Sequence, residues 1–314
     1  MTPAIGELAI GERAVKALGF IGLGVMGEPM CANLIARSGR PVYGTDRAPA
    51  PVASLAERGM VPCGTAAEVG RQTDIVFVCV ASGDQLREVC FGPDGLIGDS
   101  PEARSPQARV IIDCSTTSVA LTRDFAERCG RLGVAWIDAP IARGREAAHS
   151  GTLSIMVGAD PVLFGAVEPL LRCIGSDVTR CGGTGCGQVV KILNNKVMIQ
   201  TVHALAEALV VAEAAGVDGT LLFEVLSGSS ADSQALRYQG FNALLPRRFP
   251  RSAFPATYAR KDIGLAIELA ETAGLEAALA ETTAELLDRA IATGHSQDYY
   301  PVILKVLERL RGGD

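Results

Sequence analysis

A glycine motif that directly follows an apolar stretch constrains the fold of this chain more than any other feature. Residues 18–27 read LGFIGLGVMG, a GxGxxG pattern at the end of a predicted strand, and a helical segment with Pro29 in its first turn follows. The first glycine permits a tight turn, the second lets a pyrophosphate approach the backbone, and the third lets helix and strand pack closely. The pattern therefore predicts a dinucleotide-binding unit whose helix N-terminus binds the phosphates. The residues expected at the phosphates are Gly22, Gly24, Val25, Met26 and Gly27.

An acidic residue ends the next predicted strand. Asp46 lies 19 residues beyond Gly27, where a carboxylate binds the ribose hydroxyls of NAD and repels the 2′-phosphate of NADP. Arg47 follows immediately and can turn toward a 2′-phosphate. We expect NAD as the cofactor and keep NADP as the alternative.

Short β-rich runs alternate with amphipathic helical stretches up to about residue 180. This alternation predicts an α/β fold with a parallel, doubly wound sheet and right-handed crossovers. Beyond the glycine-rich stretch 182–187 the pattern is helical, and a long apolar run over 188–215 predicts a helix that joins two domains. We expect a flexible N-terminal extension (1–14), a Rossmann domain (15–186) and an all-α domain (187–314). The predicted strands are 15–21, 42–46, 75–80, 110–113, 134–137 and 153–157.

Charge and cysteine content restrict the class of partner. The net charge of −6 argues against nucleic acids and anionic membranes, because both attract basic surfaces. Nine cysteines without paired spacing and only three histidines predict reduced thiols in a cytoplasmic protein and no metal site. Residues 1–14 lack the pattern of a signal peptide, and no apolar stretch reaches the roughly 20 residues of a membrane span. We therefore expect no membrane partner.

Four further segments, read with the glycine loop, resemble the β-hydroxyacid dehydrogenase family, whose best-known member is 3-hydroxyisobutyrate dehydrogenase. They are 113–116 (DCST), 138–140 (DAP) leading to 151–158 (GTLSIMVG), 182–195, and Lys261 with Asp262. Their order and spacing match the family from residue 17 to about residue 310. The resemblance implies an enzyme that transfers a hydride between NAD(P) and a small 3-hydroxy acid or its semialdehyde.

The resemblance assigns the catalytic acid/base to Lys191, in the segment GQVVKILNN at 187–195. Lys191 lies about one turn into a helix, where the helix dipole and partial burial disfavour a charged ammonium and move its pKa toward neutrality. Such a lysine can donate a proton to an alkoxide or accept one from a hydroxyl. Asn194 and Asn195 follow on the same helix face and are expected to hold the substrate. A solvated surface lysine is the alternative.

The resemblance also implies four further cofactor-binding residues outside the glycine loop. It assigns Thr116 to the nicotinamide side, and it places Val80 and Ala81, at the end of a predicted strand, against the cofactor. The carboxyl ends of strands are where doubly wound sheets bind ligands. Lys261 matches a family lysine that reaches the cofactor from the helical domain, and an ordinary surface lysine is the alternative.

The segment after the DAP motif departs from the family. Most members have a Val-Ser-Gly-Gly run that binds the substrate carboxylate, whereas residues 141–144 here read IARG. The guanidinium of Arg143 offers a planar fork of donors suited to carboxylate, sulfonate or phosphate. This substitution resembles the sulfolactaldehyde reductase branch, so we expect Arg143 to bind the substrate anion. The alternative is that Arg143 faces solvent or pairs with Glu146. Ala142 and Gly144 are expected to line the same pocket.

Other proteins use the same scaffold. An imine reductase usually replaces the catalytic lysine and an inactive NAD(P)-binding module has no need of it, so Lys191 argues against both. A 6-phosphogluconate dehydrogenase needs a helical domain much longer than residues 187–314, so we do not expect that activity. The expected partners are a small anionic substrate and further copies of the chain, because the alanine-rich long helix predicts a homodimer or homotetramer formed by helix packing.

Overall fold

The chain forms two structural units, residues 1–191 and 192–314, in the computed structural model. The structure describes residues 9–10, 13–97, 107–251 and 253–312. The sequence places the domain boundary between residues 186 and 187, and helix α8 (Cys186–Ala214) runs through both positions. One continuous helix therefore belongs to both units.

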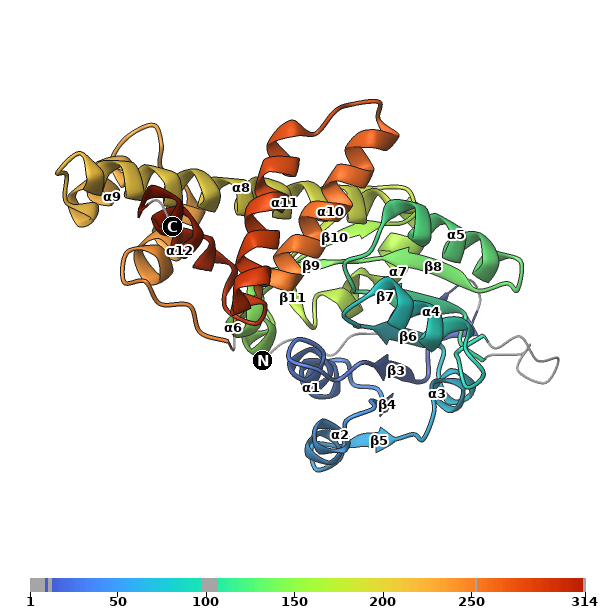
Figure 1. The fold of residues 1–314 in the computed structure, drawn as a ribbon. Helices are drawn as coiled ribbons and strands as arrows, with labels where there is room; N and C mark the ends of the chain where they lie inside the picture. The colour runs from blue at the N-terminus through green and yellow to red at the C-terminus, as the bar shows by residue number, and fades with distance from the viewer. Residues whose placement is uncertain (1–8, 11–12, 98–106, 252, 313–314) are drawn as a thin grey trace. The chain divides into compact units, whose positions relative to one another are not determined.

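The first unit is built around a twisted sheet with the strand order β11-β10-β8-β7-β6-β3-β4-β5 (Figure 1). The pairs from β8 to β5 are parallel, as the alternating pattern predicts. Strand β10 is parallel to β11 but antiparallel to β8 and to β9, which pairs beside it. The strands are β3 (Leu18–Ile21), β4 (Val42–Thr45), β5 (Met60–Pro62), β6 (Ile75–Val78), β7 (Val110–Asp113), β8 (Ala135–Asp138), β9 (Ile141–Ala142), β10 (Leu153–Gly158) and β11 (Gly175–Gly182).

Helices cover both faces of this sheet because its central strands are apolar on both sides. All residues of β3, β6 and β7 are buried, which is typical of a parallel sheet between helical layers. Alternate residues of β6 belong to different hydrophobic clusters. Phe77 is part of the cluster that includes residues of α1, α2 and α7, and Val76 is part of the cluster that includes residues of α3, α4 and α5. The helices are α1 (Gly27–Arg37), α2 (Pro49–Ala56), α3 (Ala66–Gln72), α4 (Gly83–Phe91), α5 (Val119–Gly130), α6 (Gly144–Ser150) and α7 (Pro161–Leu171).

Local sequence signals fix where most of these helices begin. The side chains of Thr65, Ser82, Ser118 and Asp160 each accept a backbone N–H bond at the start of a helix. Such caps satisfy donors that have no partner within the helix. Helix α1 has no side-chain cap at Met26. The N–H groups of its first turn are thus not capped by that residue, and α2 and α6 likewise lack a side-chain cap.

The segment before β3 is only partly described. Residues 9–10 (β1, Ala9–Ile10) and 13–14 (β2, Arg13–Ala14) pair as antiparallel strands. A segment expected to be a flexible extension therefore includes a short ladder. Residues 1–8 and 11–12 of the predicted extension lie outside the described residues.

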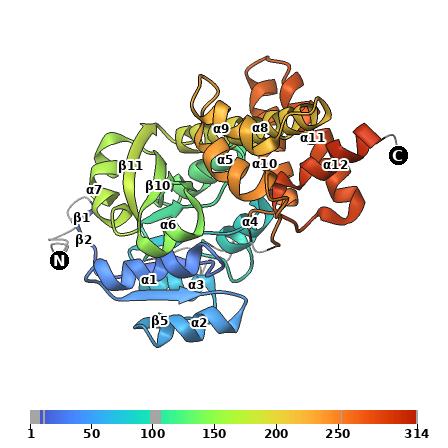
Figure 2. The same cartoon turned by 90° about the vertical axis from the view of Figure 1, so that its left-hand side faces the viewer.

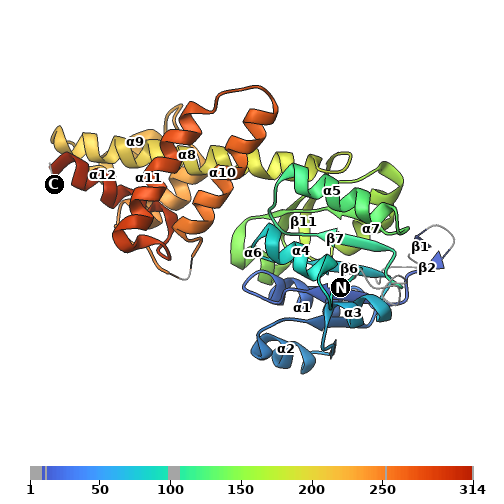
Figure 3. The same cartoon turned by 45° about the vertical axis from the view of Figure 1, so that its right-hand side comes forward.

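The second unit is helical, as predicted. Helices α10 and α11 lie side by side (Figure 3). The core contains residues from α8, such as Ile199 and Leu209, together with Phe223, Leu287 and Tyr300, all fully buried. Its elements beyond α8 are α9 (Gly219–Ser227), the π-helix η1 (Leu236–Leu244), α10 (Ala256–Thr272), α11 (Ala278–Ala290), the short η2 (Ile291–His295) and η3 (Tyr300–Val302), and α12 (Ile303–Gly312).

Helix α8 contradicts the expectation that no segment matches a membrane span. By length and composition it is apolar enough to cross a bilayer. A core helix of a soluble protein passes the same test, and α8 contributes Ile199, Val202 and Leu209 to the core of the second unit. Its apolar character is thus weak evidence for a membrane segment.

Candidate active site

The three glycines of the GxGxxG loop differ in what surrounds them. A side chain on Gly22, whose φ is +89°, would overlap the carbonyl oxygen of Cys79, and one on Gly27 would overlap the carbonyl oxygen of Gly22. At Gly24, by contrast, no described atom other than those of Gly24 itself and its two chain neighbours lies within 4 Å of where a Cβ would stand. Packing within the protein thus explains the first and third glycines. The second faces open space at the N-terminus of α1, where a pyrophosphate has room to approach.

Asp46 fastens the glycine loop to the end of β4. Its Oδ2 accepts a hydrogen bond from the Leu23 N–H at 2.5 Å, and its Oδ1 accepts one from the Ala48 N–H at 2.7 Å. The side chain is half-buried, whereas Arg47 beside it is exposed. The carboxylate that the sequence assigns to the ribose therefore also orders the backbone of the phosphate loop.

The ends of β6 and β7 are joined by the Ser115 side chain. Ser115 Oγ accepts a hydrogen bond from the Val80 N–H at 3.0 Å, and the Ser115 N–H donates to Asp113 Oδ1 at 2.9 Å. The Ala81 N–H donates to Gln85 Oε1 at 3.0 Å. In the order β7-β6-β3-β4, the residues Thr116, Val80, Gly22 and Asp46 thus follow the carboxyl ends of four adjacent parallel strands. The structure brings these predicted cofactor residues to one edge of the sheet.

A buried carboxylate stands at the start of α8. Asp138, at the end of β8, is fully buried, and its oxygens accept hydrogen bonds from the Gly185 N–H at 2.7 Å and the Gln188 N–H at 2.9 Å. Burial raises the pKa of Asp138 above its ordinary value, and the backbone N–H donors oppose that rise. The sequence analysis assigned no role to Asp138 or Gln188, because no local pattern shows that these two residues are in contact.

Lys191 lies one turn beyond Gln188 on α8 and is only 8% exposed. The solvated lysine considered as an alternative would be far more exposed. Of the two asparagines that follow it, Asn195 is buried and Asn194 is exposed. The structure thus distinguishes two side chains that the sequence treated alike.

In the second unit, Asn195 is held by an aspartate on α10. Asn195 Nδ2 donates to Asp262 Oδ2 at 2.6 Å, and Asn194 Nδ2 donates to Asn195 Oδ1 at 3.1 Å. Lys261 Nζ lies 3.4 Å from Asp262 Oδ1, and the Asp262 side chain is buried. Asp262 therefore connects Asn195 and Lys261, two residues that were predicted to belong to the site, although no role was predicted for Asp262 itself. Its position next to Lys261 in the family segment was the available signal.

Arg143 makes an ion pair that the sequence did not anticipate. Its Nη1 lies 2.6 Å from Asp177 Oδ2 and also donates to Ser176 Oγ and to the Thr152 carbonyl. The pairing with Glu146 considered from the sequence is wrong, because Arg143 contacts Ser176 and Asp177 at the start of β11 instead. The other alternative holds in part, since 44% of the Arg143 side chain is exposed to solvent. The hydroxyl of Ser176 and the guanidinium of Arg143 lower the pKa of the Asp177 carboxyl. Ala142 lies in β9 and Gly144 begins α6, so both flank this arginine.

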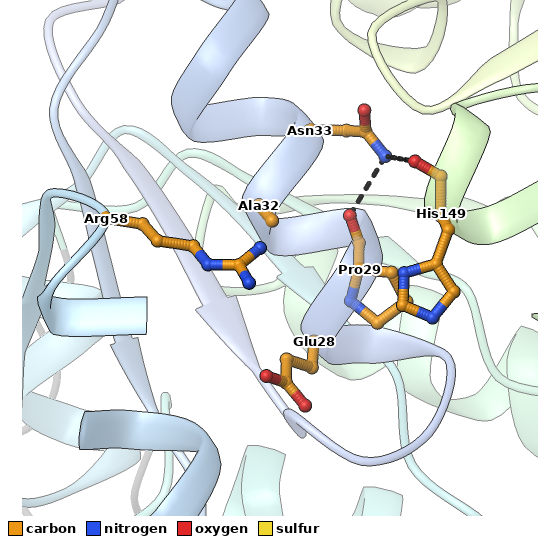
Figure 4. Close-up of a pocket in the computed structure, with 6 residues that line it drawn as sticks. All are labelled: Glu28, Pro29, Ala32, Asn33, Arg58 and His149. Atoms are coloured by element: carbon orange, nitrogen blue, oxygen red, sulfur yellow. Dashed lines mark hydrogen bonds between the residues drawn. The ribbon is translucent and has the colours of Figure 1, made fainter. Parts of the chain in front are cut away.

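Helix α6 lies next to α1 (Figure 2). A hollow of about 280 Å³ lies along α1 and is also lined by His149 of α6 (Figure 4). Asn33 closes one side, since its Nδ2 donates to the carbonyl oxygens of Pro29 and His149. None of the predicted site residues lines it. The lining residues are Glu28, Pro29, Ala32, Asn33, Arg58 and His149.

Metal ligands do not gather among the described residues. Over residues 9–10, 13–97, 107–251 and 253–312, no group of three or more His, Cys, Asp or Glu side chains is placed to hold a metal ion. The cysteines are free thiols, and burial raises the pKa of several, including Cys31 and Cys79, to about 12.

Both units match families of known dehydrogenases. Residues 17–183 match the NAD binding domain of 6-phosphogluconate dehydrogenase, and residues 185–307 match the family described as NAD-binding of NADP-dependent 3-hydroxyisobutyrate dehydrogenase. The two matches together span almost the whole chain, in the order of the two predicted domains.

Individual relatives cover the chain equally well. The 2-hydroxy-3-oxopropionate reductase of Escherichia coli is 35% identical over 93% of this chain and 97% of its own length. The 2-(hydroxymethyl)glutarate dehydrogenase of Eubacterium barkeri is 31% identical over 96% of this chain and 97% of its own length.

Solved structures agree with these relatives. The Mycobacterium tuberculosis 3-hydroxyisobutyrate dehydrogenase, solved with L-serine, superposes with a TM-score of 0.82 at 28% identity, covering 93% of this chain and 99% of that one. An imine reductase from Myxococcus stipitatus in complex with NADP⁺ has a TM-score of 0.60 at 17% identity, which shows a shared fold only. The hydroxyacid reading is thus favoured over the imine reductase alternative. From its glycine loop to its last helix, this chain belongs to the β-hydroxyacid dehydrogenase family of NAD(P)-dependent oxidoreductases.

Proposed function

We propose that this enzyme transfers a hydride between NAD(P) and a small anionic 3-hydroxy acid or the matching semialdehyde, with Lys191 as the acid/base. The burial of Lys191 carries this proposal. The lysine is 8% exposed and stands one turn beyond Gln188, whose side chain contacts the loop after β7. A lysine in that position is close in sequence and structure to the carboxyl edge of the sheet, where doubly wound folds bind their cofactors.

Proton transfer by Lys191 completes the reaction. When bound, the nicotinamide supplies or accepts the hydride. In the reducing direction, Lys191 Nζ donates a proton to the carbonyl oxygen as that oxygen becomes a hydroxyl. In the oxidising direction, the neutral amine accepts the hydroxyl proton. We assign cofactor binding to the glycine loop and Asp46, to Val80, Ala81 and Thr116 at the strand ends, and to Lys261.

Arg143 is our candidate for the substrate's anionic end. Asp177, Ser176 and Thr152 occupy only its Nη1 atom. Among the described residues, the Nε and Nη2 atoms make no hydrogen bond, and 44% of the side chain is exposed. One edge of the guanidinium is thus oriented by the protein while the other is open to a carboxylate or sulfonate. Ala142, Gly144, Asn194 and Asn195 complete our candidate set for the substrate.

We also propose NAD as the preferred cofactor, because the Asp46 carboxylate disfavours a 2′-phosphate.

Finally, we propose a cytoplasmic homodimer or homotetramer. Helix α8 exposes large apolar side chains, with Leu193 at 44%, Val197 at 63% and Val211 at 66%, and helix packing would remove them from water. Light scattering on the purified protein measures the mass, and a monomer would contradict this assignment.

Steady-state kinetics test the proposed activity. NAD⁺ and NADP⁺ are each assayed against a panel of 3-hydroxy carboxylates and hydroxy sulfonates, and the reduced cofactors against the corresponding aldehydes. We expect Lys191→Ala to lower kcat by about 10²-fold or more. Lys196→Ala is the matched control, because Lys196 lies on the same helix and donates to Gln200 Oε1. Normal turnover by Lys191→Ala would remove the lysine from the mechanism.

A further inference from the structure

Three chain segments meet at Asp138 and Gln188. The Asp138 carboxylate, at the end of β8, accepts the Gly185 N–H with Oδ1 and the Gln188 N–H with Oδ2. Gln188 Nε2 in turn donates to the Ser115 carbonyl at 2.8 Å, and Gln188 Oε1 accepts the Thr117 N–H at 3.2 Å. All atoms in this network belong to buried residues. The end of β8, the loop after β7 and the first turn of α8 are therefore fastened at one point.

The carboxylate suits this place for a physical reason. The first N–H groups of a helix have no partner within the helix and carry a partial positive charge, which a buried anion satisfies. Asp138 offers one acceptor oxygen to the Gln188 N–H in the first turn of α8 and the other to the N–H of Gly185, the residue before the helix. An asparagine would offer one acceptor and would turn an NH₂ group toward the second N–H.

Two glycines leave room for this carboxylate. A side chain on Gly158 would overlap the Asp138 carboxylate, and one on Gly187 would overlap the Met156 carbonyl and stand 2.8 Å from Asp138 Oδ2. At Gly183, four residues before Gly187, no described atom other than those of Gly183 itself and its two chain neighbours lies within 4 Å of where a Cβ would stand. The close approach of α8 to Asp138 thus depends on Gly187 and not on Gly183.

We propose that Asp138 and Gln188 are positioning residues. They set the distance between Lys191 and the loop that carries Thr116. Lys191 follows Gln188 by three residues on one helix, which is a rise of about 4.5 Å. Any displacement of the first turn is therefore passed directly to the lysine. Gln188 forms hydrogen bonds with the backbone on both sides of Thr116. The same side chain therefore holds the first turn of α8 in a defined position relative to the loop where we expect the cofactor. A displacement of about 1 Å in a reacting group can slow catalysis about 10²-fold.

This inference rests on the proposed role of Lys191, and the decisive comparison is Gly187→Ala against Gly183→Ala. Both variants add one methyl group, and neither alters Asp138, Gln188 or Lys191. We expect Gly187→Ala to lower kcat by about 10- to 100-fold, while the Kd for NADH, measured by cofactor fluorescence, changes by less than about threefold. Gly183→Ala should leave both unchanged. Asp138→Asn should behave like Gly187→Ala.

A measurement on the cofactor-free enzyme separates positioning from general instability. Hydrogen exchange in the first turn of α8 should accelerate about tenfold in Asp138→Asn and Gly187→Ala, with exchange in α11 unaffected. An equal loss of cofactor affinity and kcat, or an unchanged kcat in both variants, would overturn the inference.

Gln188→Met provides the test if Asp138→Asn and Gly187→Ala both fail to fold. It keeps the side-chain length and removes both contacts to the loop after β7, so an unchanged kcat would again overturn the inference. Normal turnover in Lys191→Ala is a different result, since it refutes the proposed function and not merely the positioning role.

Discussion

Arg143 Nη1 donates a hydrogen bond to Asp177 Oδ2 at 2.6 Å, across 34 residues of sequence. The two side chains are 44% and 54% exposed, so solvent screens their attraction and the pair adds little to folding stability. Its consequence lies in orientation and charge. Asp177 holds one edge of the guanidinium and also neutralises part of the charge that a substrate anion would meet.

Replacing Asp177 with Asn should therefore tighten substrate binding. The amide oxygen can still accept from Arg143, so the orientation is kept while the competing negative charge is lost. We expect the KM for an anionic substrate to fall by about two- to fivefold, with kcat unchanged and Tm nearly unchanged. Initial-rate kinetics at low ionic strength measure this effect. A KM that rises or stays constant would show that Arg143 does not bind the substrate.

Arg143→Gly should separate stability from binding. Arg143 has a φ of 89°, a backbone conformation that costs a non-glycine residue about 1 kcal/mol or more. Glycine relieves that strain, which offsets the lost ion pair, so we expect thermal unfolding at nearly the wild-type temperature. The KM for the anionic substrate should rise about tenfold or more. Arg131→Ala, which removes another exposed ion pair, is the control, and a similar KM in both variants would contradict the prediction.

The sheet could be predicted from the sequence to the extent that its strands are apolar. β3, β6 and β7 are buried along their whole length and appear as continuous apolar runs. β11 (Gly175–Gly182) escaped prediction because it is largely polar and half exposed, and β9 because it has only two residues. The antiparallel pairing of β10 with β8 and β9 could not be predicted, because the direction in which strands pair depends on contacts between distant segments.

The residues of the candidate site could be predicted where they belong to a short motif of neighbouring residues in the sequence. The glycine loop, Asp46 and Lys191 each belong to a local pattern. The partners of Asp138 and Arg143 do not, because Gln188 lies 50 residues beyond Asp138 and Asp177 lies 34 residues beyond Arg143. Such side-chain contacts arise only when the sheet has brought its strand ends together, so no local motif encodes them.

The choice of cofactor should depend on the charge at position 46. The Asp46 carboxylate holds the Leu23 N–H, and an asparagine can keep that acceptor without the charge. Loss of a repulsion of about 1 to 4 kcal/mol should lower the ratio of kcat/KM for NAD⁺ over NADP⁺ by about tenfold or more. Arg47→Ala should change the ratio in the opposite sense. An unchanged ratio in Asp46→Asn would contradict the assignment of Asp46 to the ribose.

Alanine at Gly24 and at Gly27 should give opposite phenotypes. No described atom other than those of Gly24 itself and its two chain neighbours lies within 4 Å of a Cβ at Gly24, so Gly24→Ala should fold with a normal Tm but raise the Kd for NADH about tenfold or more by obstructing the pyrophosphate. At Gly27 a Cβ overlaps the Gly22 carbonyl, so Gly27→Ala should lower Tm or abolish folding. Differential scanning fluorimetry with a cofactor titration distinguishes the two, and normal cofactor affinity in Gly24→Ala would contradict the phosphate assignment.

Stability at mildly acidic pH should depend on His203 in the core of the second unit. Its Nδ1 lies 3.1 Å from Thr283 Oγ1, and burial lowers the pKa of the imidazole, with Glu207 opposing the shift. The folded state therefore binds fewer protons than the unfolded state, in which the pKa is about 6.5. Its contribution is present above that value and is lost as the pH falls through the lower pKa of the folded protein. We expect Tm to fall from pH 7 to pH 5, and His203→Gln to flatten that decline, while the exposed His149→Gln leaves it unchanged. Parallel Tm curves for wild type and His203→Gln would place the acid sensitivity elsewhere.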